Sequence, residues 1–118
     1  MTPPLPPERL EEIRRDLGRV LKADKPWKSP HLSAEVLARI VGIKRERLTE
    51  VFRADGTTFR TVINSCRLEE AVRLLRGSAS ITIGEAARQA GFGCETAFLE
   101  AYKKRTGKTP TEDFRKQH

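Results

Sequence analysis

A short pattern occurs twice in the chain. It consists of Ala-Arg, two further residues, Gly and a large apolar residue, and it covers residues 38–43 and 87–92. The alanine is needed where a second helix crosses closely, because a larger side chain would collide with that helix. The glycine lets the chain turn sharply at positive φ. The sequence therefore predicts two copies of a helix-turn-helix unit.

Apolar residues recur with helical spacing along the rest of the chain, and they alternate nowhere with period two. Ser33 and Thr82 precede the first helix of each copy, where a hydroxyl group accepts from a free backbone N–H. We expect an all-α protein of about seven helices. A first helix-turn-helix at about residues 33–54 is joined by a long central helix, about residues 58–76, to a second at about residues 82–106.

Four prolines lie among the first seven residues and favour an extended, polyproline-type backbone. We therefore expect residues 1–7 to form a disordered Pro-rich arm and residues 8–118 to form the domain. The segment Lys25–Pro30 contains two further prolines and breaks the first helix. We expect Trp27, within that segment, to pack over the end of the first helix.

Composition excludes several classes of protein. The chain has 118 residues, two cysteines, two histidines and a formal net charge of +7. Two Cys and two His at these spacings do not form a zinc pattern, and no nucleophile motif is present. We therefore expect no enzyme, no metal site and no cofactor. The start lacks a signal-peptide pattern and no apolar run could span a bilayer, so we expect a cytoplasmic protein whose basic charge suits a nucleic acid.

Several segments carry a family resemblance, and they are Leu32-Ser33, Leu37-Ala38, Gly42, Arg67–Ala71, Leu74-Leu75, Ile83–Ala87, Gly91-Phe92 and Tyr102–Pro110. Over roughly residues 8–116 the chain resembles the DNA-binding domain of AraC/XylS transcription regulators. The stretch from Gly91-Phe92 to Thr109-Pro110 is the most specific part of this resemblance.

The resemblance implies a sequence-specific regulator that binds double-stranded DNA and inserts two recognition helices into successive major-groove segments. It also implies action by positioning or excluding RNA polymerase, and an upstream sensor domain outside this chain. Activation and repression both stay open, as do the operator sequence, the sensed signal and the oligomeric state.

By motif position, the recognition helices are residues 44–53 and about 94–104. The residues expected at the DNA are Lys44, Arg45, Glu46, Arg47, Thr49, Glu50, Arg53, Glu95, Thr96, Glu100, Lys103 and Lys104. Arginine and threonine side chains can read base edges, whereas lysines more often contact phosphates.

Acidic residues depart from the family pattern. Glu50 and Glu100 stand where many relatives carry Arg, and Glu46 and Glu95 add further negative charge. These carboxylates could accept from cytosine N4, pair with neighbouring arginines, or weaken binding. The alternative hypothesis is therefore a protein-interaction module that keeps the fold but binds DNA weakly by itself.

Overall fold

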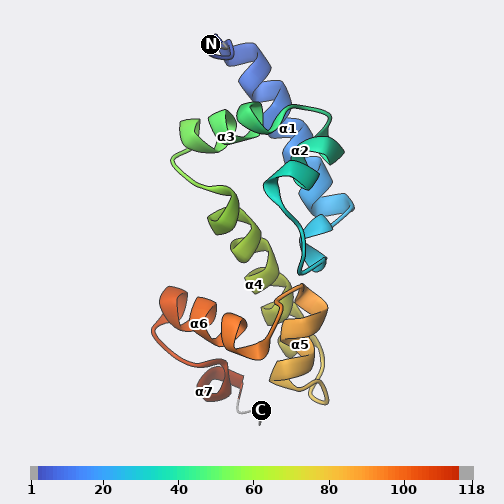
Figure 1. The fold of residues 1–118 in the computed structure, drawn as a ribbon. Helices are drawn as coiled ribbons and strands as arrows, with labels where there is room; N and C mark the ends of the chain where they lie inside the picture. Colours follow the sequence, from blue (N-terminus) through green and yellow to red (C-terminus); the bar gives the residue numbers. More distant parts are fainter. Residues whose placement is uncertain (1–2, 115–118) are drawn as a thin grey trace. The chain divides into compact units, whose positions relative to one another are not determined.

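The computed structural model describes residues 3–114, and every regular element in that range is helical. The elements in order are α1 (Pro7–Ala23), η1 (Pro26–Lys28, a 3-10 helix), α2 (Ala34–Val41), α3 (Arg45–Ala54), α4 (Phe59–Gly77), α5 (Ile83–Ala90), α6 (Glu95–Thr106) and α7 (Pro110–Phe114) (Figure 1). This confirms the prediction of an all-α protein with about seven helices. Residues 1–2 of the expected arm and residues 115–118 of the expected domain lie outside the described residues.

The described chain divides into two compact units. The first unit contains residues 3–26 and 31–62, and hence α1, α2, α3 and the start of α4. The second unit contains residues 27–30 and 63–114, and hence most of η1, the remainder of α4, and α5 to α7. Each unit thus holds one of the two predicted helix pairs, α2–α3 and α5–α6.

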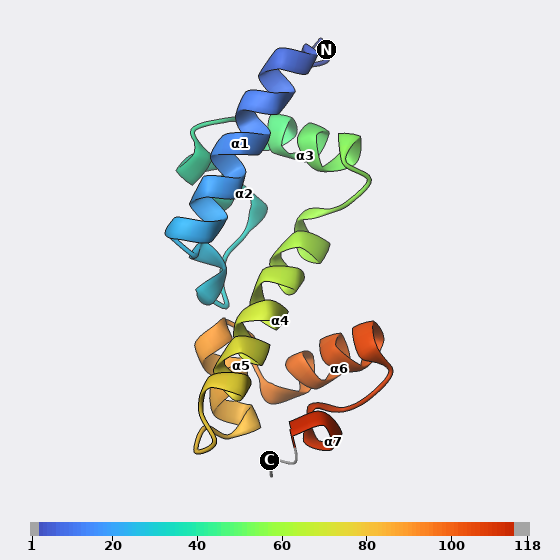
Figure 2. The same ribbon diagram turned by 180° about the vertical axis from the view of Figure 1, so that it is seen from behind.

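In the first unit, α1 packs against both α2 and α3 (Figure 2). Ser33 caps α2, since the Val36 N–H donates to its Oγ at 3.2 Å. Gly42 ends α2 with a left-handed φ of 88°. The buried apolar side chains are Ile13, Leu17, Leu37, Ala38, Leu48, Val51 and Phe52. Two of these side chains, Ile13 and Leu17, belong to α1, and burying a side chain of this size contributes about 1.5–3 kcal/mol. Helix α1 is therefore part of the core of the first unit.

In the second unit, Thr82 and Glu85 form a capping box at the start of α5. The buried face of α5 consists of Ile83 and small residues, Ala86, Ala87 and Ala90. Small side chains let α6 approach closely, as the repeated alanine predicts. The aromatic rings of Phe92, Phe98, Tyr102 and Phe114 follow one another at centroid distances of 5.5, 6.0 and 6.2 Å. This row of rings joins α6 and α7 to the core.

Residues 27–30 belong to the second unit although they lie between α1 and α2 in the chain. Arg67 of α4 donates to the carbonyl oxygens of Trp27 at 2.7 Å and Ser29 at 2.8 Å. The Trp27 oxygen also lies against Gly91, where a β-carbon would be 2.2 Å from it. The sequence predicts that Trp27 packs over the end of the first helix; the structure shows Trp27 buried, with its carbonyl oxygen against Arg67 of α4 and Gly91.

The proline-rich start is held in place. The sequence predicts a disordered arm over residues 1–7, but Pro7 is the first residue of α1, where its missing N–H leaves no bond unmade. Residues 3–6 lie before it, and their backbone hydrogen-bonds to the side chains of Arg47 and Glu50 on α3. These bonds join positions far apart in the sequence, so periodicity alone does not predict them.

Among the described residues, no helix is both long and apolar enough to cross a membrane. Within the same part of the chain, no group of His, Cys, Asp and Glu side chains could hold a metal ion. Cys66 and Cys94 are free thiols, and burial raises the pKa of Cys66.

Candidate nucleic-acid interface

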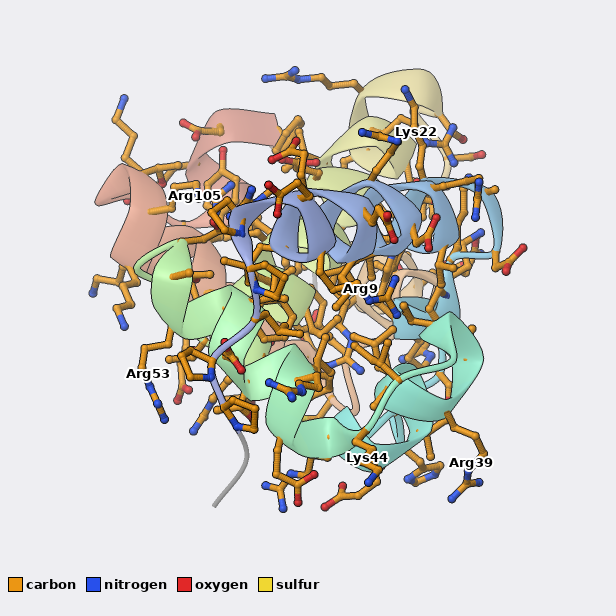
Figure 3. All side chains as sticks on the ribbon, turned by 90° about the horizontal axis from the view of Figure 1, so that it is seen from above. Arg9, Lys22, Arg39, Lys44, Arg53 and Arg105 are labelled. Carbon is orange, nitrogen blue, oxygen red and sulfur yellow. The ribbon has the colours of Figure 1, made fainter. Side chains whose placement is uncertain are left out.

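Helix α3, the second helix of the first pair, has one buried and one exposed face. Leu48, Val51 and Phe52 are buried against the first unit. The exposed side chains that the sequence predicts at DNA are Arg45, Glu46, Thr49 and Arg53. Lys44, the residue before the helix, is also exposed, and Figure 3 shows Lys44 and Arg53 at opposite ends of α3. This face offers cationic donors, a hydroxyl and one carboxylate to a partner.

The basic side chains on this face are weakly engaged. Arg45 lies 3.1 Å from Glu35 of α2, but the two side chains are 60% and 55% exposed. An exposed pair of this kind contributes about 0–1 kcal/mol, so Arg45 can exchange Glu35 for another acceptor. Lys44 and Arg53 form no ion pair with any described residue.

Arg47 and Glu50 lie on a flank of α3, away from the exposed face. They form an ion pair at 3.0 Å, with side chains only 22% and 27% exposed. Arg47 also donates to the Pro3 carbonyl oxygen at 2.7 Å, and the Leu5 N–H donates to Glu50 at 2.5 Å. The Leu5 N–H is the main cause that holds the pKa of Glu50 below its ordinary value, with Arg47 second among the favourable causes. The sequence left three interpretations of Glu50 open, and one of them was pairing with a neighbouring arginine. The structure contains that pair, with Arg47 as the partner.

Helix α6 has the same division of faces. Phe98 and Tyr102 are buried in the second unit. The exposed predicted residues are Thr96, Glu100, Lys103 and Lys104. Lys103 and Lys104 lie in the last turn, where positive charge also interacts favourably with the helix dipole. Threonine, carboxylate and two ammonium groups are thereby brought together on one helix face.

Glu95 does not share that exposed face. It is half-buried, and its Oε1 lies 3.4 Å from the point where a β-carbon of Gly84 on α5 would be. Arg88 Nη1 is 3.3 Å from the same point. The first turn of α6 packs against α5, so Glu95 faces toward the partner helix. The structure therefore separates Glu95 from Thr96 and Glu100.

A groove in the first unit is lined by basic side chains. Two of them, Arg9 and Arg39, are not among the residues that the sequence predicts at DNA. It has a volume of about 550 Å³ and is lined by Leu5, Arg9, Ile13, Arg39, Gly42, Ile43, Lys44 and Arg47. Every charged residue of the lining is basic. Figure 3 shows Arg39 close to Lys44. Arg39 is the arginine of the repeated Ala-Arg pattern, which is the signal that could have identified it.

Comparison with family models identifies the family of this chain. A family model described as a helix-turn-helix domain matches residues 37–117, which is more than half of the chain. The chain belongs to the AraC-type helix-turn-helix family. The resemblance inferred from the sequence is thereby confirmed.

Solved structures share the fold of this AraC-type domain. One is a transcriptional regulator from Chromobacterium violaceum with AraC-type DNA-binding domains, with 23% identity, coverage of 92% of this chain and 94% of that chain, and a TM-score of 0.75. Another is a DNA-binding transcriptional dual regulator from Escherichia coli K-12, with 17% identity, coverage of 98% and 93%, and a TM-score of 0.75. A third is the DNA-binding domain of the global transcriptional factor AdpA in complex with a target DNA, with 20% identity, coverage of 87% and 89%, and a TM-score of 0.73. Comparison with curated proteins gave no match.

The family match begins at Leu37, inside α2. Helix α1 and residues 3–6 therefore lie outside it, although α1 contributes to the core of the first unit. The contacts that residues 3–6 make with Arg47 and Glu50 are features of this AraC-type domain that family membership alone does not describe.

Proposed function

We propose that the chain is a sequence-specific DNA-binding module of a transcription regulator. In this proposal α3 and α6 enter successive major-groove segments of one duplex, which recur about every 34 Å. The observation that carries the proposal is the exposed face of each helix. Both faces combine a threonine hydroxyl and basic side chains on a helix whose opposite face is buried.

The residue types on the two faces suit base edges and phosphates. The Arg45 guanidinium is suited to bridging guanine O6 and N7, while Thr49 and Thr96 are suited to either base edge or to a thymine methyl group. The other exposed cationic residues serve as phosphate contacts, which add affinity without sequence information. These residues are Lys44, Arg53, Lys103 and Lys104.

The glutamates divide into two pairs in this proposal. Glu46 and Glu100 are exposed with the basic residues and accept from cytosine N4. Glu50 and Glu95 are half-buried beside basic side chains, so they order the helices and do not read bases. Four carboxylates near two recognition helices are thereby compatible with binding to a polyanion, helped by the net charge of +7.

The comparisons support the same function. The AdpA domain, which has this fold, is described in complex with a target DNA, and the Escherichia coli relative is described as a DNA-binding transcriptional dual regulator. We further propose that the domain works in the cytoplasm, communicates with RNA polymerase, and receives its signal from a sensor domain upstream.

The test is a selection from random duplexes at about 150 mM salt, followed by sequencing of the retained pool. We expect two short motifs about one helical turn apart. Arg45→Ala should weaken one motif and Thr96→Ala the other. Arg15→Ala, an exposed arginine on α1, is the control and should leave both motifs intact. A pool without any motif would overturn sequence-specific binding.

The exposed carboxylates Glu46 and Glu100 favour a second candidate function. A module that docks a basic protein surface would also need acidic side chains on an exposed helix face. A salt titration separates the candidates, because each neutralised phosphate contributes about 0.9 log units of affinity per log unit of salt. A shallow slope together with a motif-free pool would favour the interaction module.

A further inference from the structure

Two hydrogen bonds hold the segment Pro3–Pro6 on α3. In one the segment is the acceptor, and in the other it is the donor. The Pro3 carbonyl accepts from the Arg47 guanidinium, and the Leu5 N–H donates to the Glu50 carboxylate. Arg47 and Glu50 are themselves ion-paired. Backbone and side chains thus form one closed network of four groups.

Leu5 is the only residue of 3–7 that has a backbone N–H, because the other four are prolines. That one donor is used on Glu50. The neighbouring prolines restrict the backbone before it binds, so holding this segment on α3 costs little conformational entropy. The Leu5 side chain is half-buried and lines the basic groove beside Ile13 and Ile43.

The network changes the charge that α3 offers to a partner. An uncompensated carboxylate at position 50 would repel phosphate one turn away from Arg53. With the Leu5 N–H and Arg47 as donors, its negative charge is compensated within the protein. Arg47 in turn is held along the flank of the helix and does not extend to the exposed face.

We infer that Pro3–Pro6, Arg47 and Glu50 form a positioning device, the arm latch, which neutralises Glu50 so that α3 can approach DNA through Arg45, Thr49 and Arg53. Arg47 and Glu50 are positioning residues in this account, and neither reads a base. The latch is a property of the free protein, while its effect on DNA rests on the proposed function.

Two substitutions at one position isolate the donor. Leu5→Ala removes the side chain and keeps the N–H, whereas Leu5→Pro removes the N–H as well and suits a segment that is already proline-rich. The first readout is an NMR titration of the Glu50 carboxyl carbon in the full chain without DNA. We expect a higher pKa for Glu50 in Leu5→Pro than in Leu5→Ala or the parent chain. Equal pKa values in all three would overturn the latch.

The second readout is affinity for the duplex that the selection retains. We expect Leu5→Pro to bind about three- to ten-fold more weakly than Leu5→Ala, because the charge of Glu50 is then less compensated and repels phosphate. With Glu50→Gln in both chains this difference should vanish, because no charge is left to neutralise. A difference that persists in Glu50→Gln would overturn the role of Glu50, and equal affinities of the two Leu5 variants would overturn the effect on DNA.

The two readouts keep the two proposals apart. If the parent chain retains no duplex, the proposed function fails, and the carboxyl titration by itself still upholds or overturns the latch. If the titration shows the latch and the duplex binds, the two Leu5 variants decide whether the latch acts on DNA. Circular dichroism of each variant shows whether the helices remain folded.

Discussion

Gly91 lies so close to Trp27 that a β-carbon at position 91 would be 2.2 Å from the Trp27 carbonyl oxygen. Its φ of 102° is also a conformation that side chains rarely adopt. Gly42, at the equivalent position of the first copy, has a φ of 88° but open space around it. The same glycine of the repeat is therefore required by two constraints in the second unit and by one in the first.

We expect Gly91→Ala to lower the free energy of unfolding by roughly 3 kcal/mol or more, because strain and a backbone clash combine. Gly42→Ala should lower it by about 1–2 kcal/mol through strain alone. Urea unfolding of the two variants and the parent chain measures both effects. Equal losses at the two glycines would contradict the close approach of Trp27.

Glu70 should make stability depend on pH in the acid range. It is 5% exposed, and Arg73 donates to it at 2.7 and 2.8 Å, with Lys28 at 3.3 Å. Arg73 is the first cause that lowers the pKa of Glu70 to about 2 from an ordinary 4.5. A carboxyl whose pKa is lower in the folded state stabilises the fold above its unfolded pKa, and this contribution is lost as the pH falls from 4.5 toward 2.

We therefore expect Glu70→Gln to lower the free energy of unfolding by about 1–3 kcal/mol at neutral pH, with solvent screening of the exposed Arg73 setting the lower value. The loss should shrink toward pH 3. Urea unfolding at both pH values is the measurement, and Glu69→Gln, at an exposed neighbouring position, is the control. A loss from Glu70→Gln that is the same at both pH values would contradict the ionic contribution.

Tyr102 is the only tyrosine of the chain, so the absorbance of tyrosinate reports on it directly. Burial, followed by its hydrogen bond to Asp113, raises the pKa of Tyr102 to about 12. We expect a small tyrosinate fraction near pH 11, where an ordinary phenol with a pKa of about 10 is mostly ionised. The neutral phenol stabilises the fold below pH 10 or so, and this contribution is lost as the pH rises toward 12.

Asp113→Asn should lower the pKa of Tyr102, since it removes the negative charge beside the phenol. The hydroxyl bond to α7 should weaken at the same time, by about 1 kcal/mol. Spectrophotometric titration of the variant beside the parent chain measures the first effect. An unchanged midpoint would show that Asp113 does not act on the phenol.

Lys104 should contribute affinity without specificity if the proposed function holds. We expect Lys104→Ala to weaken binding about equally on all duplexes and to reduce the salt slope by about 0.9, the share of one phosphate. Lys22→Ala removes the same charge from exposed α1 and is the control. A changed base preference with an unchanged slope would instead place Lys104 at a base edge.

Glu100 distinguishes base reading from repulsion. We expect Glu100→Ala to relax preference for one cytosine, by about 1–3 kcal/mol of discrimination, with overall affinity held or lowered. Selections with the parent and variant chains show which positions change. A uniform gain in affinity for every duplex would mean that Glu100 only repels phosphate, and would favour the interaction module.

The sequence predicted the elements well because their signals are local. Ser33, Thr82, Gly42 and Gly91 mark helix ends through capping and positive φ, and each acts within a few residues. The exposed positions on α3 and α6 follow from the same helical period.

The placement of Arg47 and Glu50 could not be predicted in this way. It depends on hydrogen bonds between α3 and a proline-rich segment. The bonded residues are 44 and 45 positions apart in the sequence. Glu95 likewise lies beside Gly84 of the preceding helix, α5. Such contacts are set by tertiary packing, which residue periodicity does not encode.

The assignment of residues 27–30 to the second unit bears on how such a protein can be recombined. The backbone passes between the units at 26/27, at 30/31 and at 62/63, so neither unit is one continuous stretch of gene. A chimera that exchanges only the chain from residue 63 onward would pair a foreign Arg67 and Gly91 with the resident Trp27. An exchange of the second helix pair, α5–α6, between relatives therefore requires residues 27–30 to be exchanged together with the second half of the chain.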